Sequence, residues 1–253
     1  MIGGKIVMKP MLLNTIRNIR DLGGTLTADG HTIRPRCLIR SAHLGSASEE
    51  DLLTLRKEEK LSAVLDLRTN QERLEKPDHA EGFAYFPIPV IDDLRAGITH
   101  EQGAEEKEFP DMAFLYRLMV TRPETQSGFA RALHRIFTWD YSQGAVLWHC
   151  TEGKDRCGMT TALVLEALGV DRDAILRDYL ETNRTSLLRA RGVYERLLPI
   201  RGEVFARSVY RAYVADERYI RAAWDAMGEN YLTGTLQIPQ AEIDAFREQV
   251  LAD

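Results

Sequence analysis

A buried strand, a short polar loop and a buried helix follow one another in this chain, and this unit most constrains the fold. The strand is Ala145-Val-Leu-Trp148, and the helix is the nearly all-apolar run from Met159 to Leu168, which ends at Gly169. Apolar runs of this kind are typical of elements covered on both sides, as in a parallel sheet with helices on its faces. The unit therefore predicts an α/β domain.

Three further strands are expected before this unit and helices after it. Apolar runs at 36–40, 61–67 and 83–90 predict strands, and two prolines limit the last one to a sheet edge. Helical patterns cover about 48–57, 110–121 and 125–139, the acidic stretch 92–108 reads as a long loop, and a helical part runs over 171–253 with breaks near 199–202, 228 and 239. We expect one domain, 1–253, with a central mostly parallel sheet flanked by helices and a helical C-terminal region.

Composition excludes several classes of protein. The 253 residues are 44% hydrophobic, enough for a sizeable core, and the formal charge of −5 argues against nucleic acid as a partner. The sequence has no integral membrane segment, because no apolar run approaches the roughly 20 residues that a bilayer requires. An N-terminus without a signal peptide predicts a cytoplasmic protein, with export by another route as the alternative. The sequence gives no indication of the oligomeric state.

The loop between the strand and the helix carries the chemistry: His149-Cys-Thr-Glu-Gly-Lys-Asp-Arg-Cys-Gly158. Backbone amides at the start of a helix bind anions, and Arg156, six residues after Cys150, can grip a tetrahedral oxyanion with two N–H groups. The helix terminus, Lys154 and Arg156 all favour the thiolate form of Cys150. The loop therefore predicts a nucleophilic cysteine that faces a phosphate site.

The Cys-x5-Arg spacing resembles the signature of the protein tyrosine phosphatase superfamily. The fuller string His-Cys-x-x-Gly-Lys-Asp-Arg resembles a narrower family, the atypical bacterial tyrosine/serine phosphatases. Similar family motifs are found at 18–24, 38–41, 65–68 and 178–183. The resemblance implies a cysteine-phosphatase-like fold, no cofactor and no metal. It also implies hydrolysis of phosphomonoesters through a cysteinyl-phosphate intermediate, with a phosphorylated protein or a phosphoinositide as the partner.

The resemblance assigns functions to the loop residues. Cys150 is the expected nucleophile and Arg156 the group that holds the equatorial oxygens. The substrate-binding residues are expected to be Thr151, Glu152, Gly153, Lys154, Asp155 and Arg156. Lys154 is expected to bind a second negative group. The general acid is expected to be Asp155, with Asp92 or Asp93 in the acidic loop as the alternatives.

Four residues are expected to support the site. His149 orients the thiolate, and Asp66 and Arg68 form an internal ion pair that positions strands. Cys157 stands where the family carries a threonine or serine, whose hydroxyl helps the sulfur leave the phosphoenzyme. A thiol is a weaker donor, so dephosphorylation is expected to slow. Two alternatives for Cys157 are a resolving thiol and an inert buried side chain.

Two helical segments and three rival activities complete the expectations. The run 110–121 is interpreted as packing, with a lid as the alternative, and the arginine-rich stretch 184–211 as a solvated helix face, with a lipid-headgroup contact as the alternative. The rivals to a tyrosine phosphatase are an inositol phosphate or phosphoinositide phosphatase, a phosphate-binding module without turnover, and a sulfurtransferase. The Gly-Lys-Asp-Arg content of the loop argues against the sulfurtransferase.

Overall fold

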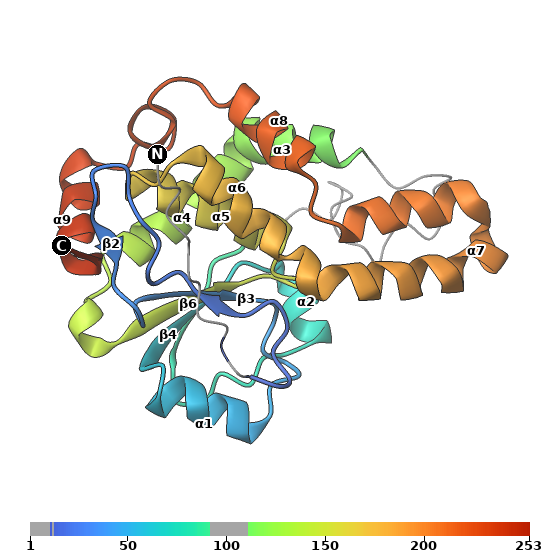
Figure 1. Ribbon diagram of the computed structural model, residues 1–253, viewed down its shortest axis with the longest axis horizontal. Helices are drawn as coiled ribbons and strands as arrows, with labels where there is room; N and C mark the ends of the chain where they lie inside the picture. The colour runs from blue at the N-terminus through green and yellow to red at the C-terminus, as the bar shows by residue number, and fades with distance from the viewer. Residues whose placement is uncertain (1–10, 12, 92–110) are drawn as a thin grey trace.

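A five-stranded sheet forms the centre of the computed structural model, which describes residues 11, 13–91 and 111–253 (Figure 1). In spatial order the strands are β1 (Arg20–Asp21), β3 (Leu38–Ser41), β6 (Ala145–His149), β4 (Leu61–Asp66) and β5 (Ala84–Pro87). All neighbours pair in parallel except β1, which is antiparallel to β3. The predicted mostly parallel sheet is confirmed, and β5, which ends at Pro87, lies at its edge as predicted.

Helices make up most of the remaining described chain. They are α1 (Glu49–Lys57), α2 (Asn70–Glu75), α3 (Met112–Thr121), α4 (Pro123–Phe137), α5 (Asp155–Ala167), α6 (Arg172–Glu181), α7 (Asn183–Tyr213), α8 (Glu217–Ala226) and α9 (Gln240–Val250). A small second sheet joins β2 (Thr32–Ile33) to β7 (Leu251–Ala252), and short helical turns occupy Tyr141–Gln143 and Tyr231–Thr235. The expected helical C-terminal region is confirmed, and α7 bends at Gly202, where the sequence predicts a break.

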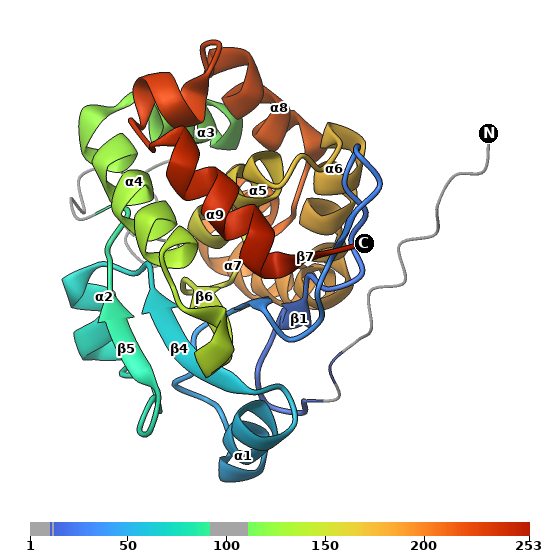
Figure 2. The ribbon, with the colours of Figure 1, turned by 90° about the vertical axis from the view of Figure 1, so that its left-hand side faces the viewer.

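The two faces of the sheet are covered unequally. Figures 1 and 2 show α1 alone on one face and α4, α5 and α9 on the other. Side chains alternate along each strand, so Val64 and Leu147 pack toward α1 while Leu65 and Trp148 join the larger core. β6 therefore lies between two cores, which holds the residues that follow it in a fixed place.

Two helices differ from the sequence-based expectation. α5 begins at Asp155 instead of Met159, because its first turn is already closed by the bond from the Gly158 amide to the Lys154 carbonyl. α2 was not predicted at all. It begins with a capping box in which Thr69 and Glu72 each accept a hydrogen bond from the other's backbone amide.

Within the predicted helical run 110–121, the described residues Met112–Thr121 fold as α3 and pack against α8, which confirms the predicted packing. Its Met112, Leu115 and Met119 are buried. In the described residues, none of the helices is sufficiently long and apolar to cross a membrane.

Candidate active site

The loop 150–154 leaves the central strand β6 at the carboxyl edge of the sheet. His149, the last residue of β6, pairs in register with Ser41 of β3 and Asp66 of β4. Gly153 takes φ +68°, and a Cβ there would lie 2.5 Å from the Ser41 carbonyl oxygen. Only glycine lets the loop pass this close to β3. Cys150 lies at the base of the loop and is 2% exposed.

Arg156 is in the first turn of α5, and its guanidinium is fixed by Glu72 of α2. Nη1 donates to Glu72 Oε2 at 2.6 Å and Nη2 to Glu72 Oε1 at 2.7 Å, while the Thr151 hydroxyl donates to the same Oε1. Burial would raise the pKa of Glu72, but the bonds from Arg156 outweigh it and lower that pKa to about 2. The pair leaves other N–H groups of Arg156 for a bound oxyanion, so Glu72 orients the arginine without using all its donors.

Sequence reasoning missed Glu72, although a signal was present. Thr69 and Glu72 have the spacing of a capping box, which predicts a helix start with the glutamate fixed at its third position. The amide of Thr69 donates to Glu72 Oε2, the oxygen that also receives Arg156 Nη1. The capping box of α2 therefore places the carboxylate that holds the arginine.

A buried cluster of Asn18, Arg20, Arg40 and Asp178 holds the loop from the outside; we call it the Asp178 cluster. Arg40 Nη1 and Arg20 Nε donate to the Asp178 carboxylate at 2.5 and 2.7 Å. Arg40 Nη2 and Asn18 Nδ2 donate to the carbonyl of Gly153 at 2.7 and 2.8 Å. These bonds draw a loop carbonyl outward, the orientation that leaves loop amides free to face an anion.

A second buried cluster of Asp66, Arg68, Asp78 and His149, the Asp66 cluster, lies at the end of β4 and β6. Arg68 Nη2 donates to both carboxylates, at 2.6 Å to Asp66 and 2.5 Å to Asp78. The ion pair predicted between Asp66 and Arg68 is confirmed. His149 Nε2 lies 3.1 Å from Asp78 Oδ2, and Nδ1 donates to the Cys150 carbonyl at 3.3 Å. Asp78 is a second residue that sequence reasoning missed.

The protonation of His149 depends on this cluster. Burial lowers the pKa of the imidazole, but Asp66 and Asp78 together outweigh burial and raise that pKa above its ordinary value. In the described residues, Asp66, Asp78 and His149 are also a group whose ligand atoms lie close enough to hold a metal ion. The Arg68 guanidinium already bridges the two carboxylates, so this donor set does not fit a cation.

Lys154 does not present its ammonium group at the open side of the loop. It is 1% exposed, and Nζ donates to the Ala212 carbonyl at 2.5 Å and lies 3.0 Å from Asp155 Oδ1. The structure contradicts the expectation that Lys154 binds a second negative group. Its ammonium group already donates to carbonyls at the end of α7 and pairs with the Asp155 carboxylate. Lys154 instead ties the loop to the end of α7.

The candidate acids lie in different parts of the chain. Asp155 is 6% exposed, and its Oδ1 accepts from the Tyr116 hydroxyl of α3 at 2.8 Å. It is thus next to Arg156 at the start of α5, inside a buried polar group. Asp92 and Asp93 are outside the described residues.

Glu152 and Cys157 form their contacts with residues outside the loop 150–154. Glu152 pairs with Arg17 at 3.0 Å and Arg189 at 3.2 Å. Cys157 is fully buried, and its thiol donates to the Trp148 carbonyl at 3.6 Å. Burial raises the pKa of Cys157 to about 11.

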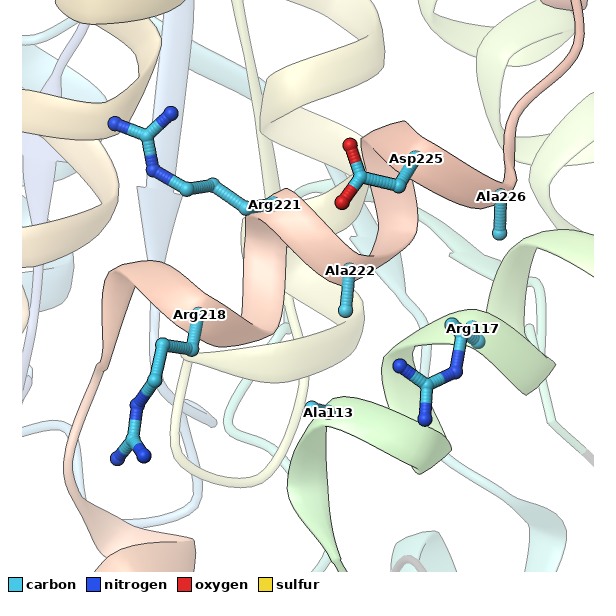
Figure 3. Close-up of a pocket in the computed structure, with 7 residues that line it drawn as sticks. All are labelled: Ala113, Arg117, Arg218, Arg221, Ala222, Asp225 and Ala226. Atoms are coloured by element: carbon cyan, nitrogen blue, oxygen red, sulfur yellow. The ribbon is translucent and has the colours of Figure 1, made fainter.

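A shallow pocket of about 400 Å³ lies between α3 and α8, and none of its lining residues belongs to the loop (Figure 3). Its arginines are balanced by acids: Arg218 pairs with Asp216, Arg221 pairs with Glu217, and Asp225 also lines the pocket. Its charges therefore do not select an anion.

A cysteine and an arginine on one strand-to-helix loop at the carboxyl edge of a parallel sheet are the arrangement of a cysteine-dependent phosphatase, an enzyme that hydrolyses phosphoric monoesters. The model of the tyrosine phosphatase family matches residues 11–252, and the chain belongs to that family.

Two relatives agree with this assignment. The "Triple specificity protein phosphatase PtpB" of Mycobacterium tuberculosis is 35% identical over 197 residues, which are 69% of this chain and 70% of the relative. A protein of Cupriavidus necator named "Putative tyrosine-protein phosphatase" is 32% identical over 260 aligned residues, covering 92% of this chain and 86% of the relative. The predicted family is confirmed.

Proposed function

We propose that the protein is a metal-independent protein tyrosine phosphatase with relaxed specificity, acting from a single catalytic domain. One observation carries the proposal: Cys150 and Arg156 share a loop that the Asp178 cluster holds from outside and Glu72 holds through its arginine. The Mycobacterium tuberculosis relative is named a triple specificity phosphatase, and this name supports a broad range of substrates.

The chemistry has two steps. In the first, the Cys150 sulfur attacks phosphorus in line and the bond from phosphorus to the leaving oxygen breaks, while an acid protonates that oxygen. Loop amides and Arg156 stabilise the equatorial oxygens. In the second, water attacks the phosphorus, the S–P bond breaks and phosphate leaves. No step requires a metal ion.

The nucleophile is tested by Cys150→Ser. This variant is expected to lose hydrolysis of p-nitrophenyl phosphate and of a phosphotyrosine peptide by about 10⁴-fold or more, while inorganic phosphate still binds. Activity of the unaltered enzyme is expected to survive excess EDTA. Residual turnover by Cys150→Ser, or an unaltered enzyme that only binds phosphate, would refute the mechanism, and the second result would favour the phosphate-binding module.

The general acid is proposed to be Asp155, with Asp92 and Asp93 as the alternatives. Asp155→Asn is expected to damage hydrolysis of phosphotyrosine much more than hydrolysis of esters with very acidic leaving groups, which need no proton. The same differential for Asp92→Asn or Asp93→Asn, with a uniform loss for Asp155→Asn, would transfer the function to the acidic segment.

The substrate class is tested by a panel. We expect phosphotyrosine peptides to give the highest kcat/KM, followed by phosphoserine and phosphothreonine peptides. The alternative of an inositol phosphate or phosphoinositide substrate loses one support, because the Lys154 ammonium is buried. Phosphoinositides with the highest kcat/KM would favour that alternative.

The free cysteines Cys37, Cys150 and Cys157 suit a reducing compartment, and we propose a cytoplasmic location. Cell fractionation with an antibody tests this, and recovery in the culture medium would contradict it.

A further inference from the structure

Helix α7 runs out from the body of the molecule, bends and returns, as Figure 1 shows; we call residues 183–213 the α7 arm. The bend is at Gly202, which takes φ +80° inside the helix. The base of the arm is closed by Asn183, whose side chain donates to the Ala215 carbonyl at 2.7 Å and accepts from the Ala215 amide at 2.9 Å. The arm is therefore a hairpin of two half-helices on a fixed base.

The arm carries a charge opposite to that of the rest of the chain. It contains seven arginines against two glutamates, a balance of +5, in a chain whose formal charge is −5. The other residues together therefore carry −10. A positive segment on an acidic protein is attracted to an anionic surface, while the remainder is repelled by it. This attraction would lead the arm, and not the body, to meet that surface first.

Several large apolar side chains of the arm are exposed to solvent. Leu188 is 82% exposed, Ile200 is 71% and Val204 is 61% exposed. Ile200 and Val204 flank the bend at Gly202, and Leu187 and Leu198 are also exposed. Large apolar side chains grouped on an exposed segment mark an interaction site. Arginines mixed with aliphatic side chains on a helix are the composition of segments that lie in a bilayer interface.

The base of the arm contacts the catalytic loop at two points. Lys154 Nζ donates to the Ala212 carbonyl, and Arg189 lies 3.2 Å from the Glu152 carboxylate. A surface that binds the arm would therefore lie at the same end of the molecule as the loop.

We propose that the α7 arm binds the surface of an anionic phospholipid bilayer. Arginines beyond the base of the arm contact lipid phosphates, and the aliphatic side chains at the bend enter the headgroup region. Binding would place the loop next to the membrane, where phosphorylated proteins and lipids are presented. The inference concerns attachment and does not depend on which substrate the loop hydrolyses.

The test is co-sedimentation of the full chain with vesicles of phosphatidylcholine, with and without phosphatidylserine. We expect binding only to the vesicles that contain phosphatidylserine, weakened by added salt. Ile200→Asn with Val204→Asn is expected to weaken the apparent partition by about tenfold, and Arg191→Gln with Arg196→Gln by a similar factor. Hydrolysis of p-nitrophenyl phosphate in solution should stay unchanged in both variants, because these side chains lie outside the loop.

Matched controls carry the same changes elsewhere. Leu74→Asn alters a 79% exposed leucine of α2, and Arg117→Gln with Arg122→Gln removes two exposed arginines at α3. These variants should bind like the unaltered protein. Equal loss in the controls and the arm variants, or equal binding to both kinds of vesicle, would overturn the proposal. A dimer seen by light scattering that only the arm variants abolish would overturn it too, because a second copy would then cover the arm.

Discussion

The Asp178 cluster and the Asp66 cluster are opposite in charge composition, although both are buried beside the same loop. The first combines two guanidinium groups, Arg20 and Arg40, with one carboxylate. The second combines two carboxylates with one guanidinium, and His149 completes it. Buried charges have to be paired, so each cluster must compensate its excess charge in a different way.

In the Asp178 cluster the excess positive charge faces the loop, because Arg40, together with Asn18, donates a hydrogen bond to the Gly153 carbonyl. Burial, and then the neighbouring Arg40, lower the pKa of Arg20, as expected where two cations share one anion. In the Asp66 cluster the excess negative charge of the two carboxylates raises the pKa of His149. The Asp178 cluster thereby places positive charge close to the loop, which suits a site for a phosphate dianion.

Removing the Asp178 carboxylate, which Arg20 and Arg40 share, should have the largest effect on stability. Asp178→Asn leaves two buried guanidinium groups without an ionic partner, so we expect the free energy of unfolding to fall by about 3–5 kcal/mol. Asp78→Asn leaves Asp66 to pair with Arg68, and a loss of about 1–3 kcal/mol is expected. Urea unfolding measures both. As a control, Asp173→Asn on the exposed face of α6 should change stability by less than about 0.5 kcal/mol. A larger loss for Asp78→Asn than for Asp178→Asn would contradict the comparison.

The two arginines that bridge within the clusters should differ in function. Arg40→Lys can keep an ion pair with Asp178, but one nitrogen replaces the fork that also reaches Gly153. We expect competitive inhibition by inorganic phosphate to weaken about tenfold, together with a fall in kcat/KM.

Arg68→Lys is the matched control, because the Arg68 guanidinium bonds to Asp66, Asp78 and the Lys76 carbonyl, and the described structure gives it no bond to a carbonyl of the loop 150–154. It should lower stability by about 1–3 kcal/mol and leave the inhibition constant for phosphate within about twofold. If both variants weaken phosphate inhibition equally, Arg40 has no positioning function of its own.

The clusters should also differ in their response to pH. A histidine whose folded pKa is raised contributes stability that is complete below its ordinary pKa of 6.5 and is lost as pH rises through the folded value. The free energy of unfolding should therefore decline above pH 6.5, by at most about 1.4 kcal/mol per pH unit. His149→Gln should remove this decline, measured by urea unfolding between pH 6 and 9. Persistence of the same slope in the variant would assign it to another group.

The sequence predicted the parts of the site that are continuous in the chain. Cys150 and Arg156 belong to one strand–loop–helix unit, whose strand and helix the structure confirms. The Asp66–Arg68 pair spans two residues, so a local pattern was sufficient to predict it. Glu72 is 84 residues from Arg156, and only the fold brings the two together. Lys154 is buried because its ammonium group contacts the end of α7. The spacing of residues within the loop does not predict this contact.

A smaller effect is expected at Cys157, which follows Arg156 in the first turn of α5. Its thiol donates weakly to the Trp148 carbonyl, at a position where the family resemblance implies a hydroxyl. Cys157→Thr should raise kcat by about two- to threefold and reduce the burst of product, because a hydroxyl stabilises the departing thiolate better. Stopped-flow kinetics with p-nitrophenyl phosphate measure both quantities. Cys157→Ala, which has no donor, should not raise kcat, and a rise in that variant would refute the explanation.

The smallest effect is expected on oxidation. Burial raises the pKa of Cys157 to about 11, so the side chain is a neutral thiol near pH 7, and it is fully buried. Because the thiolate is the reactive form, these properties argue against Cys157 as a resolving thiol for Cys150. We expect the rate of peroxide inactivation, and its recovery with dithiothreitol, to be the same in the unaltered enzyme and in Cys157→Ala. Mass spectrometry should find oxygen added at Cys150 and an unmodified Cys157. A Cys150–Cys157 disulfide, with faster irreversible loss in Cys157→Ala, would instead establish the resolving function.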